Sequence, residues 1–433
     1  MAQKRKLLSW ILSLCCFLGA SSLSACGGEG TGSNSSSGQK VDLTQVMKIG
    51  TFNDPFVTKE AYELLAETGI NWIVVNKTRT HSQVLKVLDY CDELDIDVLV
   101  MARINNKTLN NNEYMEHKSF AGINMQDEPV LSDFAKLAET VNTVEERYPG
   151  KLAYSNLFPD PEANVSKLGT ETYEEYVDEF CKQVLGEMDG KKVLSFDIYP
   201  LETILGEHAV QSRYCPNLEL IAKYAKKYNA EPQMYLQSIC YANRRIPTSE
   251  DLNFQVYCAF AFGYRALNWF AYYTPGPSAE FTETDIGIVD RSGKPTELYD
   301  RVKAMNEEIF KFDGVYLSYT WDETIPVYGQ EESDDQFSLS RMENQKETVK
   351  GVSKIEATYD ALVGRFERNG DTAYMVTNFR EPRKSKGNEI TLTFEKAKKV
   401  KVWINGEAQE IALDNHKLTL SLPAGEGAFV EVM

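Results

Sequence analysis

The chain has 433 residues, of which 42% are hydrophobic and 25% are charged. This composition provides apolar material for one large core and a smaller second one, and it argues against extended disorder. The chain carries 64 Asp and Glu against 46 Lys and Arg, a net charge of -18. Such a field repels phosphate groups, so we expect no nucleic-acid partner. The sequence also lacks a glycine-rich dinucleotide motif and a Walker-type loop, and no nucleotide is expected.

The first 26 residues resemble a bacterial lipoprotein signal with its lipobox. Three basic residues, Lys4–Lys6, precede the short apolar run Leu7–Leu18, and Leu23–Cys26 follows with small residues before the cysteine. In such signals the cysteine thiol, here that of Cys26, takes a diacylglycerol. An ordinary secretory signal cleaved nearby is the alternative. Residues 27–42 predict a flexible Gly/Ser linker. Together with the lipoprotein-like signal, this linker leads us to expect an extracytoplasmic protein that is anchored by lipid to the bacterial cell membrane.

Between residues 43 and 313, short apolar runs alternate with amphipathic stretches. Eight strands are predicted: Met47–Thr51, Trp72–Asn76, Val98–Met101, Gly122–Gln126, Leu152–Asn156, Val193–Ile198, Gln233–Gln237 and Ala266–Tyr272. Helices are predicted between them, at Lys59–Glu67, Ser82–Leu94, Ser132–Arg147, Glu171–Leu185, Leu218–Tyr228 and Glu250–Phe262, with N-caps at Ser132 and Ser249. Eight βα units are typical of a (β/α)8 TIM barrel, with an open doubly wound sheet as the second choice.

The pattern changes in residues 314–433, which predict a small all-β antiparallel sandwich. Short alternating runs occur at Leu362–Phe366, Ala373–Thr377, Ile390–Phe394, Val400–Ile404, Leu418–Leu422 and Ala428–Val432. Asn-Gly pairs at 369–370 and 405–406 indicate tight turns between strands. The polar segment Gly329–Gly351 is expected to be a long excursion between strands.

Cysteine and histidine spacing gives no reason to expect a metal or a disulfide framework. After the signal and Cys26, five cysteines remain without CxxC spacing, and the four histidines form no HExxH or i,i+4 group. We therefore expect no metal and no cofactor.

Carboxylates occur where two predicted barrel strands end, which is where a parallel barrel carries its reacting groups. The fourth strand runs into Asp127-Glu128-Pro129, and the sixth ends in Asp197, with Tyr199 two residues later. By alternation Asp197 and Tyr199 point in one direction. The alternatives are that Asp127 and Glu128 cap the next helix and that Asp197 binds loop amides.

Aromatic and amide side chains are expected beside these acids. Trp269 and Tyr272 follow the eighth strand, with sugar stacking and core packing weighed evenly for Trp269. Asn156 and Gln237 end strands with side chains that pair with hydroxyl groups. Two carboxylates across an aromatic cleft suit glycoside hydrolysis, in which one acid protonates the leaving oxygen and the other attacks or activates water.

At these positions the chain resembles the clan-A glycoside hydrolases, and more narrowly the family 42 (β-galactosidase-type) and family 5-like lipoproteins with an added β-sandwich. The resemblance rests on Asp127-Glu128-Pro129, Asp197–Pro200, Phe254–Tyr272, Gly287–Asp290, Gly293–Thr296 and Tyr299. It implies a carbohydrate substrate and makes Glu128 the acid/base residue. Asp127 then stands where the family has an asparagine that binds the sugar, and Tyr199, Asn156, Gln237, Trp269 and Tyr272 are the further expected sugar contacts.

One position departs from the family, whose nucleophile is a glutamate that ends strand seven. Here that strand ends in Gln237, and an amide cannot form a covalent glycosyl-enzyme. We expect Asp197 to supply the second carboxylate, with Glu202, Glu283 or Asp285 as lesser choices, and an inverting course. One alternative is a surface lipoprotein that binds glycan without catalysis. The other is that the register assigned to the predicted strands is wrong, so that a residue other than Gln237 ends strand seven. A purely structural protein would bind no saccharide.

Overall fold

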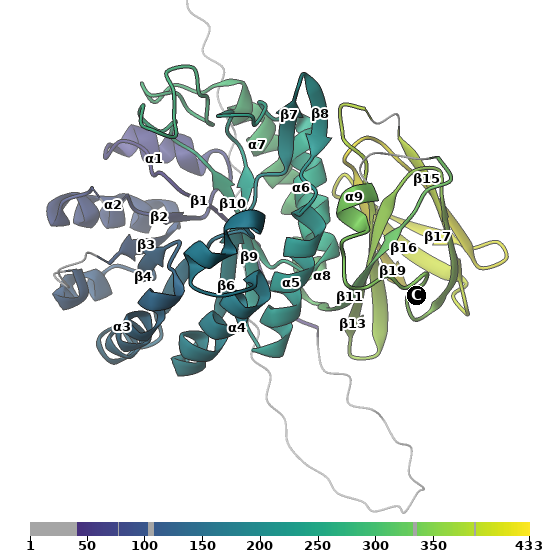
Figure 1. Ribbon diagram of the computed structural model, residues 1–433, viewed down its shortest axis with the longest axis horizontal. Coiled ribbons are helices and arrows are strands. Elements are labelled where there is room, and N and C mark those ends of the chain that lie inside the picture. Colours follow the sequence, from purple (N-terminus) through teal and green to yellow (C-terminus); the bar gives the residue numbers. More distant parts are fainter. Residues whose placement is uncertain (1–40, 77, 103–107, 332–335, 385–386) are drawn as a thin grey trace, which may run out of the picture. The chain divides into compact units, whose positions relative to one another are not determined.

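The computed structural model describes residues 41–433, apart from residues 77, 103–107, 332–335 and 385–386. Eight parallel strands form a closed barrel, in the order β1-β10-β9-β6-β5-β4-β3-β2 (Figure 1). They are β1 (Lys48–Thr51), β2 (Trp72–Val74), β3 (Asp97–Met101), β4 (Phe120–Asp127), β5 (Leu152–Leu157), β6 (Val193–Asp197), β9 (Glu231–Gln237) and β10 (Ala266–Phe270). All eight lie where the alternation predicted them, so the (β/α)8 barrel is confirmed.

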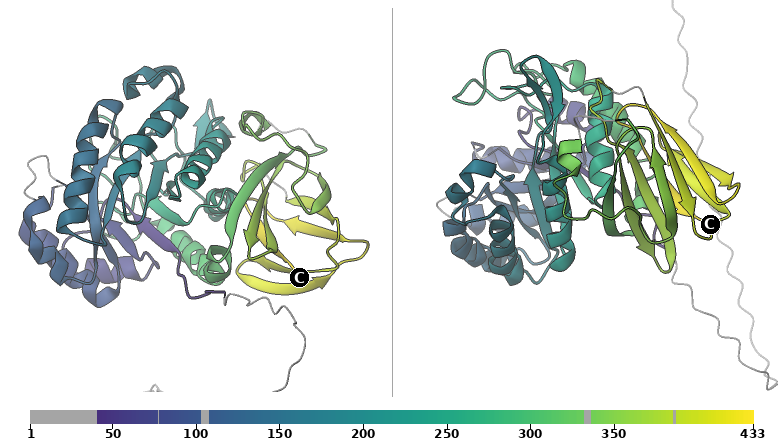
Figure 2. Two further views of the ribbon diagram at one scale, coloured as in Figure 1. Left: turned by 90° about the horizontal axis from the view of Figure 1, so that it is seen from below. Right: turned by 45° about the vertical axis from the view of Figure 1, so that its right-hand side comes forward.

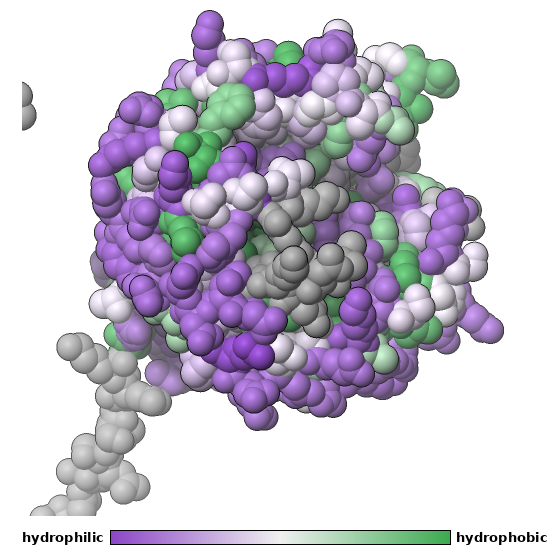
Figure 3. Space-filling model, turned by 90° about the vertical axis from the view of Figure 1, so that its left-hand side faces the viewer, coloured by the Kyte–Doolittle hydropathy of each residue, from purple (hydrophilic) through white to green (hydrophobic). Residues whose placement is uncertain are grey.

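Helices follow the strands and cover the barrel. They are α1 (Lys59–Ala66), α2 (His81–Leu94), α3 (Phe134–Arg147), α4 (Tyr173–Gln183), α5 (Tyr214–Lys227), α6 (Ser249–Ala261) and α7 (Glu297–Ile309), with 3-10 turns η1 (Thr108–Asn110), η2 (Asn112–Glu116), η3 (Leu131–Asp133), η4 (Glu162–Leu168) and η5 (Leu185–Glu187). The expected cap Ser132 lies inside η3, and Thr248 caps α6 in place of Ser249. The side that carries α1, α2 and α3 is mainly hydrophilic, as amphipathic helices require (Figure 3).

A short antiparallel hairpin lies between β6 and α5, and the sequence analysis did not identify it. Its strands are β7 (Leu201–Ile204) and β8 (Glu207–Val210). The two turn residues, Leu205 and Gly206, both have positive φ, 52° and 87°. A two-residue hairpin turn requires this conformation, and the Gly marks it. Figure 1 shows the hairpin at the upper edge of the barrel, beside the green segment that follows β10.

The remaining chain forms two antiparallel sheets after helix α8 (Asp313–Leu317). A six-stranded sheet has the order β11-β13-β14-β19-β16-β17, and a three-stranded sheet has the order β12-β15-β18. The elements are β11 (Thr320–Val327), α9 (Gln336–Leu339), β12 (Val352–Ala357), β13 (Ala361–Arg368), β14 (Asp371–Asn378), β15 (Asn388–Phe394), β16 (Lys399–Ile404), β17 (Glu407–Ala412), β18 (Lys417–Leu422) and β19 (Gly427–Val432). The predicted sandwich is confirmed, while β11, β12 and β17 were not predicted.

The sandwich packs directly against the barrel, and residues 41–433 form one compact unit (Figure 2). A Cβ added at Gly364 in β13 would lie 2.0 Å from the carbonyl oxygen of Ala261 in α6, so only glycine permits this approach. Arg245 adds a buried ion pair across the contact, 2.7 Å from Asp251 in α6 and bound also to Glu381. The sandwich therefore fixes α6 and the loop before it, at the carboxyl end of β9.

Candidate active site

The carboxyl ends of the barrel strands surround a cavity of about 950 Å³. Residues at or after the ends of all eight barrel strands line it, and five of them are acidic: Asp127, Glu128, Asp160, Asp197 and Glu280. In TIM-barrel enzymes this end of the barrel carries the reacting groups. The cavity is therefore the candidate active site.

Glu128 is held at the end of β4 in an unusual backbone conformation. Its φ is +49°, in the left-handed region that a glutamate rarely adopts, and its N–H donates to the carbonyl oxygen of Asn156 at 2.8 Å. Such conformations persist where the surrounding structure imposes them, and they gather at functional sites. The carboxylate that binds the amide of Val130 before α3 is that of Asp133, at 3.0 Å. Glu128 lines the cavity instead.

Asp197 ends β6 and is held by a chain of buried polar side chains. Its Oδ1 accepts a hydrogen bond from Asn156 Nδ2 at 2.9 Å. The other amide atom, Asn156 Oδ1, accepts from Ser195 Oγ at 2.9 Å, and Ser195 lies 2.7 Å from the hydroxyl of Tyr154. Only 8% of Asp197 is exposed. This chain fixes the orientation of the carboxylate at the floor of the cavity.

Burial and mutual repulsion raise the pKa values of both acids. Burial, with the charges of Asp197 and Asp127, raises the pKa of Glu128 to about 8. Burial and Asp127 raise the pKa of Asp197 to about 7, although the hydrogen bonds from Asn156 and Tyr199 favour its ionised form. Two carboxyls that repel each other in this way retain a proton near neutrality. The pair can therefore offer one proton donor and one ionised oxygen.

Aromatic rings form one wall of the cavity. The rings of Tyr199 and Phe270 stack with centroids 5.3 Å apart and planes at 22°. Tyr241 meets Phe270 nearly edge-on, and Phe281 lies 5.2 Å from Tyr241. The sequence analysis included Tyr199 among the site residues but not Tyr241, Phe270 or Phe281. Such a wall suits a ligand with flat apolar faces and hydroxyl edges.

The sequence matches no protein-family model, and no curated protein is detectably similar. Solved structures resemble it. A glycoside hydrolase family 42 β-galactosidase from G. stearothermophilus is 8% identical and superposes over 90% of this chain and 99% of its own, with a TM-score of 0.53. The chain shares the overall fold of this glycoside hydrolase. The α-galactosidase I of Mortierella vinacea (8% identity, 92% and 98% covered) and a β-galactosidase from Marinomonas ef1 (12%, 61% and 60%) have TM-scores of 0.49 and 0.44.

Strand β9, the seventh strand of the barrel in chain order, ends in an amide as the sequence indicated. Strand β9 pairs Tyr235 with Asp197 and ends in Gln237. Tyr235 lines the cavity, and its ring lies 6.1 Å from that of Phe52. Glu231 begins β9, at the opposite end of the barrel. In the described residues, β9 therefore gives the cavity a phenol and no carboxylate.

The lesser choices for the second acid do not line the cavity. Glu202 in β7 accepts a hydrogen bond from Asn243, and Asp285 accepts from Thr282. Glu283 is exposed and pairs with Arg291. Asp197 shares the cavity with Glu128 and is hydrogen-bonded by the side chain of Asn156, whereas Glu280, which was not predicted, lies on the cavity wall.

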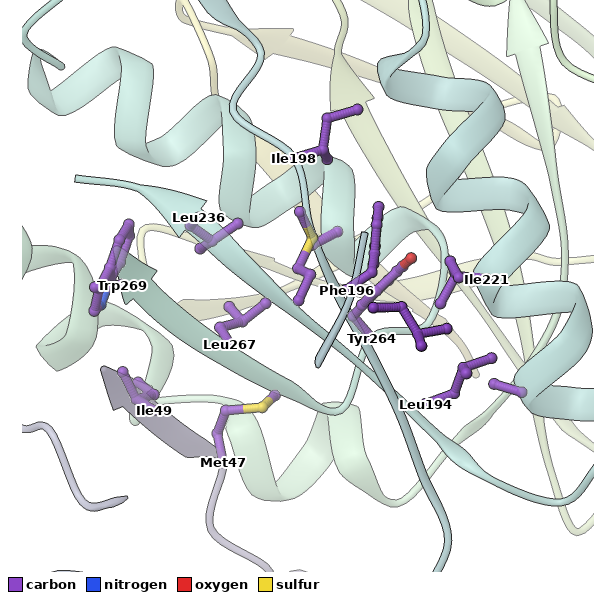
Figure 4. Packing of buried hydrophobic residues seen from close by; sticks show 14 of the residues in the cluster. Met47, Ile49, Leu194, Phe196, Ile198, Ile221, Leu236, Tyr264, Leu267 and Trp269 are labelled. Atoms are coloured by element: carbon purple, nitrogen blue, oxygen red, sulfur yellow. The ribbon is translucent and has the colours of Figure 1, made fainter. Parts of the chain in front are cut away.

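Three expected sugar contacts require correction. Trp269 is fully buried among hydrophobic side chains, and its Nε1 donates to Asn306 on α7 at 3.0 Å (Figure 4). Tyr272 is also fully buried. Gln237 accepts from the amide of Leu201 at 3.1 Å and donates to the carbonyl oxygen of Arg245 at 2.9 Å.

These errors have two physical reasons. Side chains alternate between the two faces of a strand, and buried backbone groups need hydrogen-bond partners. Since Phe270 faces the cavity, its neighbour Trp269 must face the helices. Gln237 satisfies buried backbone groups of the hairpin and of the loop before α6, so its amide is not available to a ligand. In contrast, Asp127, Glu128, Asn156, Asp197 and Tyr199 all line the cavity. Among the described residues no three His, Cys, Asp or Glu are grouped as metal ligands.

Proposed function

We propose that the protein is a glycoside hydrolase that cleaves O-glycosidic bonds of oligo- or polysaccharides, of the β-galactosidase type named for the family 42 structure that it resembles. The observation that carries this proposal is that Glu128 and Asp197, two acids with raised pKa values, line one aromatic-walled cavity. The barrel fold adds support because its carboxyl end is the usual location of catalysis.

In the proposed mechanism Glu128 is the general acid. Its raised pKa keeps it protonated near neutrality, so it can transfer a proton to the leaving oxygen as the glycosidic bond breaks. Asp197, ionised and oriented by Asn156, acts on the opposite side. If Asp197 removes a proton from the attacking water, the anomeric configuration inverts. NMR of the first-formed anomer tests this, because a retained configuration would assign Asp197 a nucleophilic role.

The deciding experiment compares wild type with Glu128→Gln on a panel of aryl glycosides and oligosaccharides. Loss of the proton donor should lower kcat by about 10²- to 10⁴-fold. Glu280→Gln, compared at its own pH optimum, is the matched control, since Glu280 lines the same cavity and acts on Glu128 only through its charge. An unchanged rate in Glu128→Gln, with a cleavable substrate in hand, would remove Glu128 from the mechanism.

A second candidate is a glycan-binding protein without catalysis. The observation that favours it is strand β9, where Tyr235 and Gln237 stand in place of the acid that clan-A enzymes use. This function predicts that wild type binds a saccharide of the panel, measured by calorimetry, and cleaves none of them. Turnover of any one, abolished in Glu128→Gln, decides against it.

We further propose that the enzyme is tethered outside the cytoplasm through a lipid on Cys26. Cys26 and residues 27–40 of the linker lie outside the described residues, and the support is the lipoprotein-like signal in the sequence. Across the part of the chain that the structure describes, no helix is long and apolar enough to span a membrane. Cys26→Ser should move the expressed protein from the detergent phase to the aqueous phase in a phase-partitioning assay. Equal partitioning of both forms would contradict the tether.

A further inference from the structure

Arg244 extends into the cavity from the loop that follows β9. Its backbone N–H donates to the carbonyl oxygen of Tyr241 at 2.8 Å, and the segment pairs with Glu202 in the hairpin. Thr203 of the hairpin also donates its N–H to the carbonyl oxygen of Asn243 at 2.8 Å. The hairpin and the loop thus hold one another, and together they fix where the Arg244 side chain begins.

The guanidinium of Arg244 lies over the aromatic wall. Its Cζ is 4.6 Å from the ring centroid of Tyr241 and 5.5 Å from that of Tyr199. Stacking of this kind holds the planar group in place and leaves its N–H edge for a partner. Both rings line the same cavity as Glu128 and Asp197. The cation is therefore positioned within reach of a saccharide that contacts the wall.

Hydrogen-bonding capacity at Arg244 is unused within the described part of the chain. Its Nε is buried and has no partner there, and no ion pair to a described acid is formed at this side chain. The other arginine that lines the cavity, Arg213, donates to the carbonyl oxygen of Asp160. The next residue in sequence, Arg245, is bound by Asp251 and Glu381 away from the cavity. Of these three arginines, Arg244 alone keeps its donors for a ligand.

The charge of Arg244 favours the ionised form of Asp197, but no hydrogen bond or ion pair joins the two side chains among the described residues. The hydrogen bonds that hold Asp197 come from Asn156 and Tyr199. A buried donor without a partner destabilises a protein unless something else pairs with it. Because guanidinium groups bind carboxylate and sulfate oxygens through paired N–H bonds, the complementary ligand group is an anion.

We propose that Arg244 determines specificity by binding an anionic substituent of the saccharide, the carboxylate of a hexuronic acid or a sulfate ester. This inference rests on the proposed function in that both place a sugar in the same cavity. Because five acidic side chains line the cavity and repel any anion, the contacts of the sugar ring with the aromatic wall must offset this repulsion. The aromatic wall binds the ring of the sugar while Arg244 pairs with its charged group.

The test uses matched glycosides that differ only in charge. These are glucosides and glucuronides, galactosides and galacturonides, and galactosides with and without a 6-sulfate, in α and β series. The readout is the ratio of kcat/KM for the anionic member to that for the neutral member. In wild type the ratio should exceed one, and in Arg244→Met, which keeps the alkyl stem, it should fall about 10- to 100-fold. Arg244→Lys should restore part of it, because charge returns without the fork.

Calorimetry with Glu128→Gln separates this inference from the proposed hydrolysis. If no substrate is cleaved but the anionic sugar binds and Arg244→Met abolishes that binding, hydrolysis fails and the Arg244 assignment holds. If neutral sugars are cleaved and the ratio is the same in wild type and Arg244→Met, the Arg244 assignment is overturned and hydrolysis stands. Absence of both cleavage and binding overturns both. The carboxylate and sulfate series show which anion is preferred.

Discussion

Asn156 Nδ2 donates a hydrogen bond to Asp197 Oδ1 at 2.9 Å and so joins the ends of β5 and β6. The same amide is oriented from behind by Ser195, at 2.9 Å. Because an amide donor stabilises a carboxylate more than a carboxylic acid, this bond favours the ionised form of Asp197 against the effect of burial. Asn156 therefore sets the charge state of the second acid as well as its direction.

Asn156→Ala should raise the pKa of Asp197. A hydrogen bond to a charged group contributes about 1.5 to 3 kcal/mol, equivalent to about one to two pKa units. The acid limb of kcat/KM should move to higher pH by that amount. Ser155→Ala is the control, since this neighbouring hydroxyl is buried without a partner in the described residues. An acid limb that stays in place in Asn156→Ala would show that the bond does not tune Asp197.

The activity of wild type should depend on pH in a bell-shaped curve with a narrow optimum. Activity should rise as Asp197 ionises, with a pKa of about 7, and fall as Glu128 loses its proton, with a pKa of about 8. Asp127→Asn removes a charge that raises both values, so both limbs should shift to lower pH. Glu280→Gln removes a charge that acts on Glu128, and only the alkaline limb should shift. A broad plateau from pH 5 to 9 in wild type contradicts the assignment.

The sequence was sufficient to predict the barrel because its signals are local. Eight apolar runs with intervening amphipathic helices predict the topology, and the acids at strand ends follow from chain order. The direction of a side chain at a strand end is set by register, which is why Trp269 was expected in the cavity where Phe270 lies. Gln237 was misjudged for another reason. Its partners, the backbone of Leu201 and that of Arg245, belong to segments whose approach no local pattern encodes.

Arg245→Met should destabilise the protein strongly. Its guanidinium lies 2.7 Å from Asp251 and also binds Glu381, and the side chains of both acids are fully buried. Removing the cation breaks both contacts and leaves Arg383, 3.4 Å from Asp251, as the remaining described cation at that acid, at a cost of about 3 to 5 kcal/mol. Urea denaturation measures the change. The adjacent Arg244→Met is the matched control and should cost less than about 1 kcal/mol, because it loses ring stacking and the charge that acts on Asp197 but no ion pair of the described residues.

If the two variants were equally stable, the contact between loop and sandwich would not depend on this ion pair. In that case the glycine-mediated approach of Gly364 to Ala261 would be the main determinant of the interface. Gly364→Ala tests this directly, since its added methyl group meets backbone that cannot move aside.

A second buried acid makes stability depend on pH. Glu426, in the turn before β19, accepts a hydrogen bond from Asn253 on α6 at 3.1 Å. Burial and the charge of Glu308 on α7 raise its pKa from 4.5 to about 7. Glu308 accepts in turn from the hydroxyl of Tyr257 at 2.5 Å. The folded protein therefore holds a proton here that the unfolded chain releases above its ordinary pKa.

Because the pKa of Glu426 is raised in the folded protein, the protonated carboxyl contributes its full stabilisation below pH 4.5. This contribution to the free energy of unfolding is lost as the pH rises through about 7. At pH 8 the penalty relative to acid pH is about 3 kcal/mol. Glu426→Gln keeps an oxygen for Asn253 and cannot ionise, so it should exceed wild type in stability at pH 8 and match it near pH 4.5. Glu407→Gln, at an exposed pair with Lys311, should show no such trend. Parallel curves of unfolding free energy against pH for wild type and Glu426→Gln would contradict the shift.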